Sequence, residues 1–298
     1  MNVFITGTSG YIGGSVARLL LEHGHQVRGL VRSAEKAALL SRLGIVPVLG
    51  DLDDLGLLAR EARAADAVIN AASSDHAGSV HAIIDALADS GKALLHTSGT
   101  SVIGDDARGE RESETILDEK SDLHVQPGKQ HRRDIDLAVL HAAARGVRSA
   151  VICPSLIYGL GSGLSPDSVQ IPFLIRNARE QGAVQIVGHG VNRWSNVHID
   201  DLKGLYLRAL TNATAGAFYF AESGEASFAE IGSVLSERLG LPLEWLPAEV
   251  AAARWGEARA YFTFGSNCRV RGVHARSELG WAPVHRSVID WIRTEPTL

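Results

Sequence analysis

The first twenty residues decide the fold of this chain: Met1–Leu20 reads MNVFITGTSGYIGGSVARLL. The run Asn2–Thr6 has the apolar, β-branched composition of a buried strand. Gly7, Gly10 and Gly13 follow at once in the spacing G-x-x-G-x-x-G, and the apolar pattern then takes a helical period. Glycines let the backbone approach a pyrophosphate, whose charge is met by amides at the helix N-terminus. A glycine-rich turn without a ligand is the alternative, but the flanking strand and helix favour nucleotide binding.

Cofactor contacts are expected along this turn and after two later strands. The hydroxyl groups of Thr6, Thr8 and Ser9 add polar contacts to those of the backbone amides. The expected cofactor-binding residues are Gly7, Thr8, Ser9, Gly10, Tyr11, Ile12 and Gly13 in the turn, Asp51 and Leu52 after the third predicted strand, and Ala71 and Ala72 after the fourth. For the last four, loop formation or packing is the alternative.

The end of the second predicted strand selects between NAD and NADP. An acidic side chain there accepts from the ribose hydroxyls of NAD, whereas an arginine pairs with the 2'-phosphate of NADP. The sequence reads GLVRSAEK, so Arg32 occupies this position and Ser33 follows it. A solvated surface arginine is the alternative. The sequence therefore predicts NADP as the preferred cofactor.

The organisation of the chain predicts an α/β fold. From Asn2 to about Cys153, short β-rich runs alternate with helical patterns, which indicates a Rossmann-type, doubly wound parallel sheet. After Pro154 the alternation weakens, and we expect a smaller C-terminal substrate-binding lobe. The expected division is 1–153 as the NAD(P)-binding domain, with a later contribution from about 190–222, and 154–189 with 223–298 as the lobe. The polar run 104–130 is expected to be a lid or a solvated loop.

Composition restricts the partners and the location. The chain has 298 residues, 45% of them hydrophobic and 21% charged, and a net charge of -5. This balance argues against nucleic-acid or anionic-membrane partners and favours a small-molecule substrate. Cys153 and Cys268 are the only cysteines and are expected to be buried thiols. With no leader-like N-terminus and no long apolar run, we expect a cytoplasmic protein.

Several motifs occur in an order that resembles a known family. They are TGTSGYIG, GDLDD, INAA, HTSGTSVIG, PSLIYGLG and NVHIDDL. Across nearly the whole chain they are similar to the extended short-chain dehydrogenases/reductases, the NAD(P)-dependent epimerase/dehydratase family. The resemblance implies a serine or threonine after the fifth strand that orients the substrate. It also implies a Tyr-x-x-x-Lys pair on the next helix, in which the ammonium shifts the phenol toward neutral pKa and also holds the nicotinamide ribose.

The chain departs from this family pattern at both places. Alignment on the VIG run puts Gly99 at the usual serine or threonine position, between Ser98 and Thr100. Gly128 and Arg132 stand near the expected tyrosine and lysine. Arg132 keeps a permanent positive charge for the ribose, but it cannot exchange protons. The resemblance therefore indicates an atypical member of the family, in which the Tyr-x-x-x-Lys pair is missing.

The candidate catalytic residues are Ser98, Thr100, His131 and Tyr158. Ser98 and Thr100 are hydroxyls at the strand end where a carbonyl would be oriented. His131 has the side chain best suited to proton transfer near neutral pH, with a solvated histidine as the alternative. Tyr158 follows the sixth predicted strand, where the family commonly carries a tyrosine that lines the site without acting as the acid.

A second motif, NVHIDDL, invites a metal interpretation. It brings His198, Asp200 and Asp201 close together in the sequence, without further ligand spacing. We predict no metal and expect Asp200 to be the N-cap of the following helix.

The function predicted from these residues is an NAD(P)-dependent oxidoreductase or epimerase. Its substrate would be a small carbonyl or hydroxyl compound, with hydride transfer through the nicotinamide. The alternative is an NAD(P)-binding sensor or regulatory protein that has lost catalysis, and a nucleotide-sugar epimerase is a third, weaker hypothesis. The family resemblance also suggests a homodimer, although ordinary sheet packing explains the same apolar helix faces.

Overall fold

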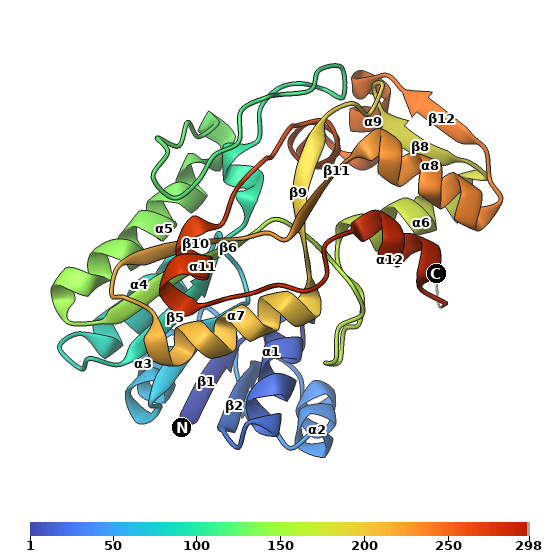
Figure 1. Ribbon diagram of the computed structural model, residues 1–298. Helices are drawn as coiled ribbons and strands as arrows, with labels where there is room; N and C mark the ends of the chain where they lie inside the picture. Colours follow the sequence, from blue (N-terminus) through green and yellow to red (C-terminus); the bar gives the residue numbers. More distant parts are fainter. Residues whose placement is uncertain (297–298) are drawn as a thin grey trace.

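The computed structural model describes residues 1–296, in which a Rossmann-type layer lies beside a smaller lobe (Figure 1). The central sheet of these residues has seven strands, all parallel. In spatial order they are β10 (Ala217–Ala221), β6 (Arg148–Pro154), β5 (Ala93–Thr97), β4 (Ala67–Asn70), β1 (Asn2–Thr6), β2 (Gln26–Val31) and β3 (Val46–Leu49). The order from β3 to β6 is that of a doubly wound fold. The fold class predicted from the sequence is therefore confirmed.

Helices cover both faces of this sheet, each with an apolar core of its own. On one face lie α1 (Tyr11–Glu22), α2 (Ala34–Arg42), α7 (Ile199–Asn212) and α11 (Val273–Leu279). On the other lie α3 (Leu55–Ala64), α4 (Ala77–Leu87) and α5 (Gln130–His141), the last followed by the 3-10 turn η3 (Ala142–Arg145). The helical spacing explains the contact: Val16 and Leu20 of α1, four residues apart, are both buried against the strands.

The smaller lobe has its own apolar core. It holds β8 (Val184–Val187) paired with β12 (Leu243–Leu246), and the mixed sheet of β7 (Leu156–Tyr158), β9 (Arg193–His198) and β11 (Gly224–Ser227). Its helices are α6 (Gln170–Gln181), α8 (Phe228–Leu239), α9 (Ala248–Trp255), α10 (Glu257–Arg259), the π-helix η4 (Ala260–Phe264) and α12 (Val288–Thr294). A capping box between Ser227 and Glu230 starts α8, which turns Phe228 into the core against Phe264.

The polar connection 104–130 is anchored near its start and near its middle. It leaves the short helix η1 (Thr100–Ile103) and ends at η2 (Pro127–Lys129). The carboxylate of Asp105 accepts hydrogen bonds from the backbone and side-chain nitrogens of Asn267, at 2.7 and 3.0 Å. Glu119 accepts from the backbone N–H of Phe220, 3.0 Å away, and so satisfies a donor on the exposed edge of β10. The connection therefore follows the lobe and the sheet edge.

The chain returns to the Rossmann layer after β9. Helix α7 packs on α1 and the sheet, β10 pairs with β6, and α11 packs on β10 and α7. The ranges given above for the two domains remain a prediction. Among residues 1–296, no helix is both long enough and apolar enough to cross a membrane.

Candidate functional site

The glycine turn closes tightly over the end of β4. Gly7 has a φ of +77°, and a Cβ built on it would lie 2.3 Å from the carbonyl oxygen of Ala71. A Cβ on Gly13 would lie 2.4 Å from the carbonyl oxygen of Gly7. Helix α1 therefore packs directly against the turn, as in folds that bind a pyrophosphate at a helix N-terminus.

This packing predicts that Gly13→Ala destabilises the protein. Since the new methyl group would meet backbone rather than a movable side chain, the cost should be about 1 to 3 kcal/mol of unfolding free energy. Gly204→Ala in α7 is the matched control, because nothing lies within 4 Å of a Cβ at that helical position. Urea denaturation of both variants checks the prediction. Equal midpoints for the Gly13 and Gly204 variants would contradict it.

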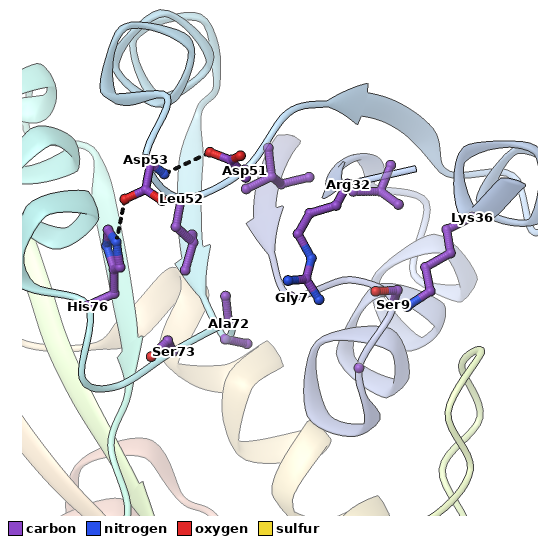
Figure 2. A pocket seen from close by; sticks show the side chains of 14 residues that line it. Gly7, Ser9, Arg32, Lys36, Asp51, Leu52, Asp53, Ala72, Ser73 and His76 are labelled. Atoms are coloured by element: carbon purple, nitrogen blue, oxygen red, sulfur yellow. Dashed lines mark hydrogen bonds and ion pairs between the residues drawn. The ribbon is translucent and has the colours of Figure 1, made fainter. Parts of the chain in front are cut away.

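A cleft of about 510 Å³ opens beside the turn, at the carboxyl ends of β1, β2, β3 and β4 (Figure 2). In parallel α/β sheets this is where nucleotides bind. The residues that line it are Gly7, Ser9, Gly10, Leu30, Val31, Arg32, Lys36, Asp51, Leu52, Asp53, Ala71, Ala72, Ser73 and His76. The cleft thus brings together the glycine turn and the expected residues after strands two, three and four.

Other residues expected along the turn send their side chains elsewhere. Thr8 is fully buried, and its hydroxyl donates to the carbonyl oxygen of Ile5 at 2.8 Å. The Tyr11 hydroxyl donates to the carbonyl oxygens of Tyr158 and Gly159, at 3.1 and 2.8 Å, and so ties α1 to the lobe. Ile12 packs against the core beneath the sheet. Any contact of these three with a cofactor would therefore come from the backbone.

Two basic side chains stand on the β2 side of the cleft. Arg32 directly follows β2 and Lys36 lies in α2, and Figure 2 shows both extending toward the glycine turn. Among residues 1–296, no carboxylate forms an ion pair with either of them. Ser33 is the N-cap of α2, where its Oγ accepts from the backbone N–H of Lys36 at 3.3 Å. Lys36 was not predicted, although its place four residues after Arg32 is the signal that could have found it.

The opposite wall is organised by local hydrogen bonds. The Asp51 carboxylate accepts from the backbone N–H groups of Asp53 and Asp54, at 2.9 and 3.2 Å. This supports the loop-forming alternative for Asp51. His76 caps α4 through Nδ1, which accepts from the backbone of Ser79 at 3.1 Å, while its Nε2 lies 3.1 Å from Asp53. His76 and Asp53 are wall residues that the sequence analysis missed.

The expected hydroxyls at the end of β5 point into the protein. Ser98 is 6% exposed, and its Oγ donates to the Asp136 carboxylate at 2.8 Å. Thr100 is 1% exposed, and its hydroxyl has no hydrogen-bond partner in the described part of the chain. The neighbouring Ser101 instead reaches the helix start of α5, where it accepts from Arg132 at 3.2 Å. Ser101 was missed because the sequence gives no direction for a side chain in the turn after a strand.

Arg132 is the centre of the polar cluster at the start of α5. Its guanidinium forms a two-pronged ion pair with Asp75, in the loop after β4, and this hydrogen bonding lowers the pKa of Asp75. A terminal nitrogen lies 3.6 Å from the place a Cβ would take at Gly99. A Cβ at this position would make only ordinary van der Waals contact with the guanidinium, so the distance does not explain the glycine.

Two more basic residues flank Arg132. His131 is exposed, with Nε2 3.0 Å from the carbonyl oxygen of Asp75. Lys129 is half-buried, with its amine 5.7 Å from the centre of the Phe262 ring in η4. Burial, and then the charge of Arg132, lower the pKa of Lys129. The cluster thus spans the β4 and β5 loops, α5 and the lobe.

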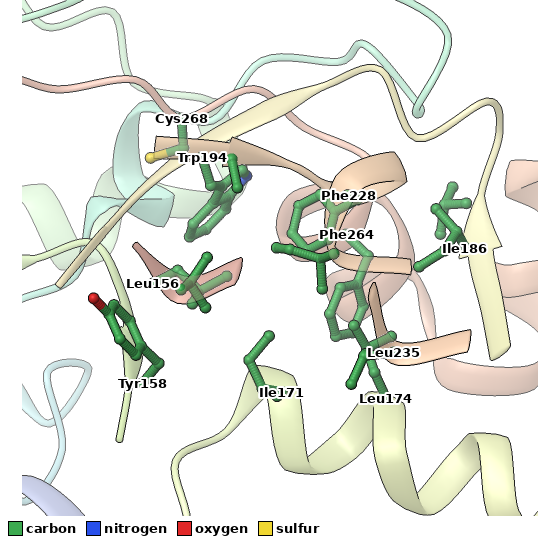
Figure 3. Packing of buried hydrophobic residues seen from close by; sticks show 14 of the residues in the cluster. Leu156, Tyr158, Ile171, Leu174, Ile186, Trp194, Phe228, Leu235, Phe264 and Cys268 are labelled. Atoms are coloured by element: carbon green, nitrogen blue, oxygen red, sulfur yellow. The ribbon is translucent and has the colours of Figure 1, made fainter. Parts of the chain in front are cut away.

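Tyr158 is neither a lining residue of the cleft nor a member of the polar cluster around Arg132. It is 1% exposed and belongs to the apolar core of the lobe, where Figure 3 shows it beside Leu156 and Ile171. Its ring packs edge-on against His198, 5.1 Å between centres. The hydroxyl lies near the backbone of Ser287 without a well-oriented hydrogen bond, and burial raises the pKa of Tyr158. This environment supports the packing role that the sequence left open.

We therefore expect Tyr158→Phe to keep its turnover within about threefold of the native enzyme. Removing a hydroxyl that has no partner costs little, because no hydrogen bond is lost. Steady-state kinetics and thermal unfolding, measured together, test this. A loss of about 100-fold or more with an unchanged melting temperature would instead assign the phenol to catalysis.

The motif NVHIDDL corrects one prediction. The N-cap of α7 is His198, whose Nδ1 accepts from the backbone N–H of Asp200 at 3.2 Å, and Asp200 lies inside the first turn. The sequence missed this because histidine is an uncommon cap. Ligand atoms of His198, Asp200 and His285 lie within 4.8 Å of one another, but the two imidazoles stack face to face, and Lys203 pairs with Asp200 at 2.6 Å. Stacking and internal pairing account for this cluster.

The comparisons with known proteins agree with the fold. Residues 3–219 match the model of the NAD dependent epimerase/dehydratase family, and the chain belongs to that family. The function is therefore that of an NAD(P)-dependent oxidoreductase or epimerase of the short-chain dehydrogenase/reductase superfamily. The sensor alternative is not favoured.

Relatives cover nearly the full chain. The chain is 32% identical to the oxidase ucsJ of an Acremonium species, over 95% of this chain and 92% of that protein. It is 26% identical to a 4-hydroxy-2-methyl-3-oxo-4-farnesyl-3,4-dihydroquinoline-1-oxide ketoreductase of Stigmatella aurantiaca, over 98% and 96%. The solved structure of DesIV, a dTDP-glucose 4,6-dehydratase of Streptomyces venezuelae with NAD bound, superposes with a TM-score of 0.78 at 21% identity, over 98% and 95%.

Proposed function

We propose that this protein is an NADP-preferring oxidoreductase acting on a small carbonyl or hydroxyl compound. The observation that carries the proposal is the pair Arg32 and Lys36 on the cleft wall, at the end of a strand where an acid would favour NAD. Two cations that form no ion pair with a carboxylate among the described residues suit a 2'-phosphate. The names of relatives, a ketoreductase and an oxidase, support redox chemistry on such a substrate.

The cleft fits a dinucleotide by its own geometry. The glycine turn and the start of α1 suit the pyrophosphate, and Asp51, Leu52, Ala71 and Ala72 line the remainder of the groove. When bound, the nicotinamide supplies or takes a hydride at its C4 atom. The residues of the chain have to hold the two reactants, place the substrate oxygen and move one proton.

We assign Arg132 to the substrate oxygen and the nicotinamide ribose. Its guanidinium lies at the strand end beside Gly99 and Ser101, where the family places its orienting hydroxyl. Because an arginine stays protonated, it stabilises developing negative charge on the oxygen without donating the proton. Asp75 holds the guanidinium in place through both carboxylate oxygens.

The proton is assigned to His131 or to ordered water beside it. His131 is exposed at the same helix start, and its Nε2 is fixed by the Asp75 carbonyl. An imidazole is the side chain best suited to exchange protons near neutral pH. Ser98 and Thr100 support the strand end rather than contact the substrate, because their hydroxyls point inward. A homodimer and a cytoplasmic location remain predictions.

The experiment has two stages with one preparation. Calorimetric titration with NADPH and NADH should show tighter binding of NADPH. The absorbance of NADPH should then fall when members of a panel of aldehydes and ketones are added. Tight binding without loss of absorbance for any compound would overturn the proposed function, and equal affinities would overturn the NADP preference.

A further inference from the structure

A buried carboxyl group lies directly behind the polar cluster. Asp136 in α5 is fully buried, one helical turn after Arg132. One of its carboxyl oxygens accepts a hydrogen bond from the Ser98 hydroxyl, with 2.8 Å between the two oxygens. The other carboxyl oxygen lies 3.7 Å from Nε2 of His96 in β5, and within residues 1–296 neither of these two atoms has a hydrogen-bond partner. A buried acid in such a place has a cost that packing alone does not explain.

A hydrogen-bonded chain fixes the state of His96. The Thr6 hydroxyl, at the end of β1, donates to the side-chain oxygen of Asn70, whose amide nitrogen then faces Nδ1 of His96 at 3.0 Å. Because that amide donates, Nδ1 must accept, and the imidazole proton sits on Nε2, facing Asp136. Burial, and then the charge of Arg132, hold the pKa of His96 down to about 4, so this ring stays neutral around neutral pH.

Of His96 and Asp136, the carboxyl group is therefore the one whose charge changes near neutral pH. Burial raises the pKa of Asp136 to about 6, against the lowering effects of the Ser98 hydrogen bond and of the nearby Arg133 and Arg132. The titratable and charged groups around it are His96 of β5, Cys153 of β6, Asp75 of the β4 loop, and Arg132 and Arg133 of its own helix.

We propose that Asp136 is a positioning residue of the reaction, whose ionised carboxylate holds the end of β5 and the Arg132 helix start in the active arrangement. This rests on the proposed function. As a carboxylate, Asp136 accepts a hydrogen bond from the Ser98 hydroxyl and so holds Ser98, the residue before Gly99, against α5. It also attracts Arg132, four residues earlier. Protonation removes the charge that attracts Arg132, and it weakens the Ser98 hydrogen bond because a neutral carboxyl oxygen is a poorer acceptor than a carboxylate.

The expected consequence is an acid limb in the pH profile of kcat/KM, with a midpoint near pH 6 and the active form above it. The sign follows from the ionised state being the one that positions. Asp136→Asn keeps the size of the side chain and can still accept from Ser98, but its NH2 group then faces the Nε2–H of His96, so its melting temperature is measured before its activity. Its activity should be lower at neutral pH, and the limb should be absent. A role in folding alone would lower activity without moving the limb.

Two control variants distinguish the effect of Asp136 from those of nearby titratable residues. Asp134→Asn changes an exposed acid on the same helix and should keep the limb. Because histidines also titrate near neutral pH, His131→Gln identifies any limb that belongs to that residue.

Nuclear magnetic resonance of protein labelled with ¹³C in its aspartate carboxyl groups gives a readout without substrate. The Asp136 signal, identified by its loss in Asp136→Asn, should titrate near pH 6 and shift upward by up to about one unit in Ser98→Ala, which lacks the stabilising hydrogen bond.

The outcomes are distinguishable. A limb that persists in Asp136→Asn and disappears in His131→Gln overturns the positioning role while leaving the proposed function intact. The positioning role is also overturned if the Asp136 signal does not titrate near pH 6, or if its midpoint is the same in Ser98→Ala as in the native protein. Absence of turnover by the native enzyme overturns the proposed function and, with it, this role. Loss of the limb in Asp136→Asn alone, together with the upward shift in Ser98→Ala, supports it.

Discussion

Replacing Arg132 with glutamine should lower kcat/KM by about 10²- to 10³-fold, the cost of removing one preorganised donor from a developing oxyanion. The variant keeps a polar side chain but loses the charge, the ion pair with Asp75 and the contact with Ser101. Most of the loss should fall on kcat, because charge on the substrate oxygen is largest in the transition state. Single-turnover and steady-state kinetics with one carbonyl substrate measure this.

Two further variants make the result specific. Arg132→Lys keeps the charge without the two-pronged contact and should recover only part of the activity. Arg145→Gln removes a half-exposed arginine that pairs with Asp85 near the far end of α5. Its kcat/KM should stay close to that of the native protein, since such surface pairs contribute little. An Arg132→Gln enzyme within threefold of the native rate would show that this guanidinium does not meet the reacting oxygen.

Arg32→Asp should weaken NADPH binding by about 10- to 150-fold, as expected for loss of a charge-assisted hydrogen bond. The introduced carboxylate would repel the 2'-phosphate and would accept from the ribose hydroxyls of NADH, so NADH affinity should hold or improve. Lys36→Ala should weaken NADPH in the same direction by a smaller factor, because the ammonium is a point charge without a planar fork. Calorimetric titrations of the three proteins with both cofactors provide the comparison.

The control for this pair is Arg42→Asp, which makes the same charge change at the other end of α2, away from the cleft. If the affinity changes arise from a contact with the 2'-phosphate, this variant should bind both cofactors as the native protein does. Unchanged NADPH affinity in Arg32→Asp would remove the basis for an NADP preference. An equal loss in Arg42→Asp would point to overall charge instead.

The parts of the fold that could be predicted are those set by local pattern. The glycine spacing after a β-branched run, and the alternation of strands with amphipathic helices, determined the parallel sheet and the place of the cleft. In a parallel sheet, all carboxyl ends lie at one edge, so Arg32 and Ala71 were brought together by topology alone.

Side-chain direction at the strand ends was beyond such reasoning. The side chains of Thr97 and Ser98 point to opposite faces of the sheet. Thr97 contacts Tyr206 of α7 and Ser98 contacts Asp136 of α5, so neither hydroxyl extends beyond the strand end toward a bound substrate. Tyr158 belongs to β7 of the separate three-stranded sheet, which places its ring in the core of the lobe. The role of Asp136 depends on a contact between residues 38 positions apart in sequence. No periodic pattern records contacts of that kind.

NADPH carrying deuterium at C4 shows whether the protein transfers hydride. The protein is incubated with the labelled cofactor and each active carbonyl compound, and the alcohol product is analysed by mass spectrometry. We expect deuterium from one face of the cofactor on the carbinol carbon of the product. A protein that binds NADPH tightly yet transfers no deuterium to any compound would contradict it.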